Sequence, residues 1–132
     1  MSPERAVLVE INRVRTRHHR RPLAGSPLLT APARSHSRHL ATTGTLTHED
    51  AKGAPFWQRL VAAGYPRNRR MAENLARLSD CRTSLARQTV RLWMGSPPHR
   101  ANLLDPRMRR VGIGVARLDG CRETVVTAAF GS

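Results

Sequence analysis

The sequence L-W-M-G-S-P-P-H-R-A-N-L-L-D-P, from Leu92 to Pro106, carries the clearest local structural signals in the chain. Gly95 is typical of a helix end, and Ser96 with Pro97 is typical of the cap and first residue of a new helix. His99 is then the third helical residue, where the positive end of the helix dipole favours a neutral imidazole. Such a histidine either binds a metal or accepts a proton, or it only satisfies a nearby carbonyl. Spacing alone favours neither interpretation.

Length and charge limit the class of protein. The chain has 132 residues, which predicts a single domain over residues 1–132. Of its 23 basic residues 22 are arginine and only Lys52 is lysine, and the formal net charge is +14. This charge predicts non-specific attraction to polyanions. The dense basic stretches, Arg13–Arg21, Arg67–Arg70 and Arg107–Arg110, lack the interleaved aromatic residues that base stacking needs. We therefore expect solvated surface charge and no specific nucleic-acid partner.

The location of the protein follows from weaker signals. Cys81 and Cys121 allow one disulfide, which would stabilise the fold by ~3–4 kcal/mol in an oxidising compartment. No apolar run is long enough to span a bilayer. The first residues do not form a signal peptide, so either an export segment was trimmed or the protein stays in the cytoplasm.

Hydrophobic periodicity predicts mostly helices followed by a terminal hairpin. Helical spacing covers residues 4–16, a segment from Ser26 or Thr30 to Thr43, residues 53–63, and a run that begins at a Thr83 cap and ends near Trp93. Branched residues alternate with small ones over 111–116, and a second alternating segment covers 123–130. This order predicts an α+β domain with helices packed on an antiparallel sheet.

Two further residues are candidates for a functional site. His48 lies in a polar loop, and Glu73 stands between small and apolar residues, which is unusual for a carboxylate unless it is paired or functional. By contrast, His36 falls on the apolar face of its helix and is expected to be a core histidine with a satisfied hydrogen bond. Its neighbour His39 could share a metal with it, but a lone pair of histidines is weak support.

Taken together, these segments resemble the bacterial branch of the CAP superfamily, the SCP-like domains of cysteine-rich secretory, antigen five and pathogenesis-related type-one proteins. The most specific part is S-P-P-H-R-A-N-L-L after a helix-ending tryptophan. The other matching segments are L-x-x-I-N-x-x-R at 8–15, R-S-H-S-R-H-L-A at 34–41, T-H at 47–48, A-A-G-Y at 62–65, A-E-N-L-A at 72–76, V-G-I-G-V-A at 111–116 and T-A-A-F at 127–130.

The resemblance implies a three-layer α–β–α sandwich with a small antiparallel sheet, and a cleft formed by these motifs. By motif, the cleft residues are His48, Glu73, Asn74, His99, Arg100 and Asn102. Within this set His48, Glu73 and His99 could hold a divalent metal such as zinc with an open position, or form a pH-sensitive cluster without metal. Alternatively, Glu73 and Asn74 only brace the central loop.

The chain also departs from the family pattern. The glycine of the G-E-N motif is Ala72, and no second cavity glutamate follows Trp93. The second histidine of the plant and animal members is absent from the segment 127–130. The set of two histidines and two glutamates of the plant and animal members is therefore incomplete in this chain.

Three functional hypotheses follow. The first is a secreted, extracellular or cell-envelope CAP-type module, expected to be a monomer. It would bind a small hydrophobic or cell-envelope ligand and act on lipid, peptide or cell-wall material. The second is a hydrolase in which Glu73 and His99 are catalytic and Glu73 is the general base on an activated water. The third is a polyanion binder that uses the surface arginines.

Overall fold

The computed structural model describes residues 1–79, 84–118, 120 and 122–132. Its helices are α1 (Pro3–Arg17), α2 (Pro27–Thr43), α3 (Phe56–Ala62), α4 (Leu85–Met94) and α5 (Pro97–Leu103). Its strands are β1 (Ala24–Gly25), β2 (Met71–Leu78), β3 (Arg110–Leu118) and β4 (Glu123–Gly131). The predicted α+β class is confirmed, and the predicted helices form, although the one expected over residues 53–63 begins only at Phe56. The Thr83 cap and the Cys81–Cys121 pair lie outside the described residues.

The strands form one sheet in the order β1-β3-β4-β2. The long strands β2, β4 and β3 are antiparallel neighbours, as expected, but the two-residue β1 pairs with β3 in parallel, so the sheet is mixed. Strand β2 was not predicted from the sequence. It is held by pairing with β4 along its whole length, from Met71 opposite Gly131 to Leu78 opposite Thr124.

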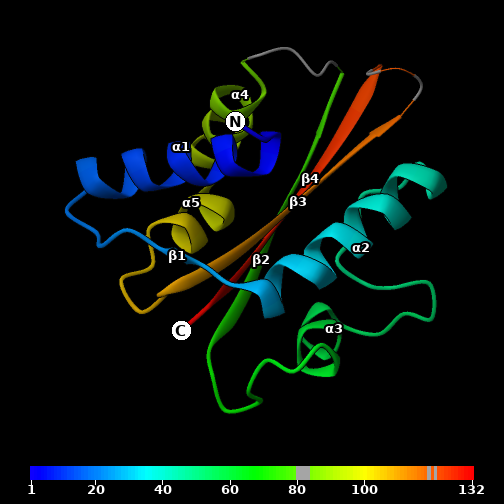
Figure 1. Cartoon of the computed structure of the whole chain (residues 1–132), viewed down its shortest axis with the longest axis horizontal. Coiled ribbons are helices and arrows are strands. Elements are labelled where there is room, and N and C mark those ends of the chain that lie inside the picture. The colour runs from blue at the N-terminus through cyan, green and yellow to red at the C-terminus, as the bar shows by residue number, and fades with distance from the viewer. Residues whose placement is uncertain (80–83, 119, 121) are drawn as a thin grey trace.

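Helices cover both faces of the sheet and make the three layers of the expected sandwich (Figure 1). Helices α1, α4 and α5 lie on one face, where Val111, Ile113 and Phe130 belong to the largest buried cluster. Helices α2 and α3 lie on the other face, over smaller clusters that include Leu29 and Leu60. Among the described residues, no helix has the length and apolar character needed to cross a membrane.

Two glycines in β3 bring α2 unusually close to the sheet. A Cβ at Gly112 would lie 2.1 Å from the carbonyl carbon of Leu29, and a Cβ at Gly114 would lie 2.3 Å from that of Ala33. Both contacts are with backbone atoms of α2. The face of β3 that carries only small residues, which the sequence predicted, is therefore the face on which α2 packs. This close approach positions the loop that leaves the C-terminal end of α2.

A buried arginine ties α1 to the segment that follows α5. The Arg15 side chain is fully buried and its Nη1 donates to the carbonyls of Leu103 (2.8 Å) and Asp105 (3.1 Å). Its Nε donates to the carbonyl of Arg21 at 2.8 Å. The guanidinium therefore satisfies the carbonyl of Leu103, which the end of α5 leaves without a helical partner, and holds the turn that follows at Asp105.

Candidate functional site

The site is built on β2, which is an edge strand of the sheet. Successive residues of a strand point to opposite faces, so Glu73 and Asn74 are directed to different layers. Glu73 and Met71 lie on the face of the sheet that α3 covers, and the side chain of Glu73 is completely buried. Asn74 is also fully buried, on the side of α5. The A-E-N motif thus supplies one polar side chain to each face of the same edge strand.

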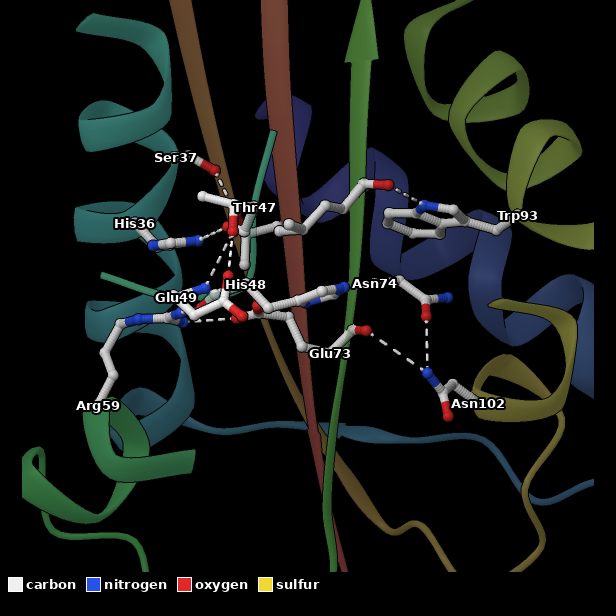
Figure 2. A network of polar contacts seen from close by, with 12 residues as sticks. His36, Ser37, Thr47, His48, Glu49, Arg59, Glu73, Asn74, Trp93 and Asn102 are labelled. Atoms are coloured by element: carbon white, nitrogen blue, oxygen red, sulfur yellow. Dashed lines mark hydrogen bonds and ion pairs between the residues drawn. The ribbon is translucent and has the colours of Figure 1, made fainter. Parts of the chain in front are cut away.

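Two basic side chains engage the buried carboxylate of Glu73 (Figure 2). His48 donates its Nδ1–H to Oε1 at 2.9 Å, and Arg59 donates Nη1–H to Oε2 at 2.5 Å. Arg59 also donates Nη2–H to the backbone carbonyl of His48 at 2.7 Å. The three residues come from the loop after α2, from α3 and from β2, so this cluster joins three segments.

His36 anchors the loop that carries His48. Its Nε2–H donates to the carbonyl of Thr47 at 2.7 Å, and its side chain is 2% exposed, which confirms the predicted core histidine. Burial lowers the pKa of His36, and the nearby Arg59 charge acts in the same direction. A neutral His36 therefore keeps Thr47, and with it His48, in place. The Thr47 hydroxyl in turn donates to the carboxylate of Glu49.

The hydrogen bond from His48 to Glu73 raises the pKa of the imidazole, although partial burial and the Arg59 charge oppose this. The His48 side chain is 47% exposed while Glu73 is 0% exposed. Among the described residues no group hydrogen-bonds Nε2 of this half-exposed imidazole, so that atom can meet a ligand or a water molecule. That atom accepts a hydrogen bond when the ring is neutral and donates one when it is protonated.

On the other face of β2, asparagines connect the strand to α5. Asn74 donates Nδ2–H to the carbonyl of His99 at 3.0 Å, and its Oδ1 accepts from Asn102 Nδ2–H at 3.0 Å. Asn102 also donates to the carbonyl of Glu73 at 3.4 Å. Next along the edge, the indole of Trp93 donates to the carbonyl of Leu75 at 3.0 Å. Outward-facing carbonyls of the edge strand are therefore covered by side chains.

A cleft of about 410 Å³ opens beside this edge. Its lining residues are His48, Glu49, Pro55, Phe56, Met71, Ala72, Glu73 and Asn102. Of the residues expected in the cleft, His48, Glu73 and Asn102 line it, and Asn74 braces it from behind. Arg100 lines a different hollow of about 330 Å³ with residues of α4 and α5.

His99 occupies the expected helix position but does not line the cleft. Ser96 has the extended backbone of an N-cap and Pro97 begins α5, so His99 is its third residue. Burial lowers the pKa of His99, and the charge of His48 lowers it further. The expected tendency to the neutral form is thus present, with burial as its main cause. The hydrogen bond between His99 and the site is the one that its backbone carbonyl accepts from Asn74.

A divalent ion was predicted between His48, Glu73 and His99, and in this structure the carboxylate that would bind it is paired with His48 and Arg59. Both carboxylate oxygens of Glu73 already accept hydrogen bonds, and the Arg59 guanidinium occupies the cation's place next to Oε2. Within residues 1–79, 84–118, 120 and 122–132, no group of three or more His, Cys, Asp or Glu side chains is placed to hold a metal ion. The metal site stays a prediction, and no chemistry below depends on it.

Arg59 is the functional residue that the sequence analysis missed. Its position on a short helix, in an arginine-rich chain, made it look like one more solvated charge. One signal was available: Arg59 is three residues after Phe56 and next to Leu60, so it lies beside the apolar residues of its helix. Its side chain is only 14% exposed.

Comparisons with known proteins agree with this architecture. The sequence matches the family described as CAP, Cysteine-rich secretory protein family, over residues 8–130. The structure resembles an outer surface protein from Borrelia burgdorferi, with a TM-score of 0.83, 19% identity, and coverage of 100% of this chain and 96% of the other. No match was found among the curated proteins.

Two larger extracellular or secretory proteins contain the same fold. An SCP-domain protein from Bacillus anthracis has a TM-score of 0.78 and 22% identity, over 98% of this chain and 43% of that one. A cysteine-rich secretory protein from Staphylococcus aureus has a TM-score of 0.70 and 18% identity, over 97% of this chain and 38% of that one. The present chain therefore spans less than half of each of these two proteins, and at these identities the likeness concerns the fold.

Proposed function

The chain belongs to the CAP, or cysteine-rich secretory protein, family, and from this premise we propose that it is an extracellular module that binds a short peptide or a peptide-bearing fragment of cell-wall material in the cleft beside Glu73. The observation that carries the proposal is the preorganised set of His48, Glu73 and Arg59, of which His48 and Glu73 line that cleft. Its charges are neutralised internally, so the set is already formed before a ligand arrives.

The size and lining of the cleft support a small, mixed ligand. A volume of about 410 Å³ is in the usual range for small-molecule sites. Pro55, Phe56 and Met71 offer apolar contacts, while His48 and Asn102 offer hydrogen bonds. A cleft with both kinds of group suits a peptide-like ligand better than a long acyl chain, which gains little from polar walls.

The position of β2 at the edge of the sheet also determines how a ligand can bind. Edge strands commonly bind peptides by adding a strand. Here Asn102 and Trp93 already hydrogen-bond the carbonyls of Glu73 and Leu75. The ligand is therefore expected to bind through its side chains and end groups in the cleft, with His48 Nε2 as the principal polar contact.

Binding can be tested by NMR titration with short peptidoglycan stem peptides, with a fatty acid as the comparison ligand. Shifts confined to His48, Phe56 and Met71 on addition of the peptide support the proposal. His48→Ala and Phe56→Ala should weaken binding by tenfold or more, while the exposed His18, on the loop after α1, gives a matched control in His18→Ala. Shifts that cluster elsewhere, or a preference for the fatty acid, would refute it.

A hydrolase is the second candidate, because a buried carboxylate that orients a half-exposed imidazole is the base–orienter half of a catalytic triad. In this geometry His48 is the general base on a water molecule, and Glu73 is the positioning residue. Among the described residues no serine, threonine or cysteine side chain hydrogen-bonds the His48 ring. Turnover of a peptide and glycan panel that His48→Gln abolishes would support a hydrolase, and no turnover with any substrate would exclude it for that panel.

A further inference from the structure

Basic stretches that are far apart in the sequence meet at one end of the sheet (Figure 1). The Arg70 backbone N–H donates to the Ser132 hydroxyl and its carbonyl accepts from the Ser132 N–H, both at 3.0 Å. The Arg109 N–H donates to the carbonyl of Gly131 at 2.8 Å, and its own carbonyl accepts from Ala24 at 2.9 Å. The starts of β1, β2 and β3 and the end of β4 are thereby held side by side.

These backbone contacts bring six exposed arginines to the same end of the sheet, and we call this group the arginine end. Its members are Arg21, Arg67, Arg69, Arg70, Arg109 and Arg110. Arg20 extends this group, because its Nε donates to the carbonyl of Leu104 at 2.7 Å. Within the part of the chain that the structure describes, the one ion pair at this end joins Arg107 to Asp105. The arginine end therefore carries a large uncompensated positive charge.

The positive charge of the arginine end extends to both faces of the sheet. Arg69 and Arg110 are close enough to Tyr65, on the α3 side, that their charges lower its pKa against the raising effect of burial. Across the sheet, the pKa of Asp105 is lowered mainly by its hydrogen bond from Arg107, and the Arg70 charge contributes. A ligand that follows the rim from one face to the other would meet positive charge throughout.

The segments of the arginine end lack the side chains for insertion into a membrane or for base stacking. The exposed large apolar residues of the described chain are Met1, Val9, Leu28, Leu46 and Leu92, and none lies in residues 20–24, 65–70, 104–110 or 130–132. Tyr65 is buried, and Trp57 is covered by the Arg67 guanidinium at 5.6 Å. Binding here would be electrostatic and would depend on the ligand's backbone charges.

We propose that the arginine end binds a linear, phosphate-bearing polyanion, such as a phosphodiester polymer of the cell envelope. Guanidinium groups hold phosphate oxygens through paired N–H donors, and arginine keeps its charge at any physiological pH. Several arginines distributed around a rim suit a polymer that places many phosphates in succession, rather than a single small anion. This inference is independent of the cleft beside Glu73, which lies on the edge of β2.

The direct test measures affinity for long-chain inorganic polyphosphate at 50 and 200 mM salt. The test variant combines four substitutions: Arg69→Gln, Arg70→Gln, Arg109→Gln and Arg110→Gln. We expect its affinity at 50 mM salt to fall by about tenfold or more, with a shallower dependence on salt, because fewer counterions are released.

The matched control removes the same charge elsewhere, through Arg38→Gln, Arg87→Gln, Arg91→Gln and Arg117→Gln, all at exposed positions outside the arginine end. Its affinity should change by less than threefold. Equal losses in the two variants would mean that net charge alone drives binding, and would overturn the proposal.

Vesicles of phosphatidylglycerol provide the competing ligand class. Binding to these vesicles with no binding to polyphosphate would overturn the proposal in favour of a membrane surface. Circular dichroism checks that the variants are folded. If the four-residue variant unfolds, the double variant Arg69→Gln with Arg70→Gln replaces it, since both positions are outside the strands. Its affinity for polyphosphate should fall at least threefold. An unchanged affinity would contradict the proposal.

Discussion

Replacing Arg59 by methionine tests whether the buried carboxylate of Glu73 depends on its guanidinium. Glu73 is 0% exposed and Arg59 is 14% exposed, and they are joined at 2.5 Å. Arg59→Met would leave a buried carboxylate with His48 as its remaining charged partner. Breaking a buried ion pair from one side typically costs ~3–5 kcal/mol. Since half-exposed His48 can partly compensate, we expect a loss of about 3 kcal/mol in the free energy of unfolding.

The pair itself is measured with a double-mutant cycle on Arg59→Met and Glu73→Gln, followed by guanidinium chloride unfolding at pH 7.5. The double variant removes both charges. Its loss in the free energy of unfolding should therefore be about 2 kcal/mol smaller than the sum of the two single losses. Arg77 and Glu123 provide a control pair at 2.7 Å, in which Glu123 is 47% exposed. Its coupling should stay below about 1 kcal/mol because of solvent screening.

Additive losses at Arg59 and Glu73, or an Arg59→Met variant as stable as the parent, would refute the reasoning. Either result would mean that the guanidinium and the carboxylate are not coupled in the folded protein. The site would then lose its internal counter-ion.

Three further predictions follow from the same structure. Folding raises the pKa of His48 above its ordinary value of 6.5. The protonated ring should therefore stabilise the fold fully below pH 6.5, and this stabilisation should disappear as the pH rises through the pKa of the folded state. Thermal unfolding of the parent and of His48→Gln across pH 5–9 measures it. Arg15→Met should cost about 3 kcal/mol or more in chemical unfolding, because it leaves buried carbonyls without donors; a loss under about 1 kcal/mol would contradict the structural role of Arg15. Gly114→Ala should cost at least ~2 kcal/mol because its Cβ would meet α2 backbone at 2.3 Å, while Gly95→Ala, with its nearest atom at 3.5 Å, should be nearly neutral; equal effects would argue against the close packing of α2.

The sequence determined the local structure well, because local signals depend on neighbouring residues. Ser96 and Pro97 begin α5 as their chemistry requires, and the alternation of glycine with branched residues in β3 showed both of its faces. The inward position of His36 followed from helical periodicity alone. The family likewise could be identified from motifs, since each motif is a short stretch of chain.

What the tertiary structure decided is which distant residues meet. Strand β2 has two buried polar residues at its centre and no clear alternation, and it exists because β4 pairs with it. Arg59 looked like solvated charge, and only the packing of α3 against β2 placed it on Glu73. The basic stretches converge for the same reason, through sheet pairing between segments far apart in the chain. Charge and hydrogen-bonding capacity can be read from a sequence, but a partner depends on contacts that the chain makes only when it folds.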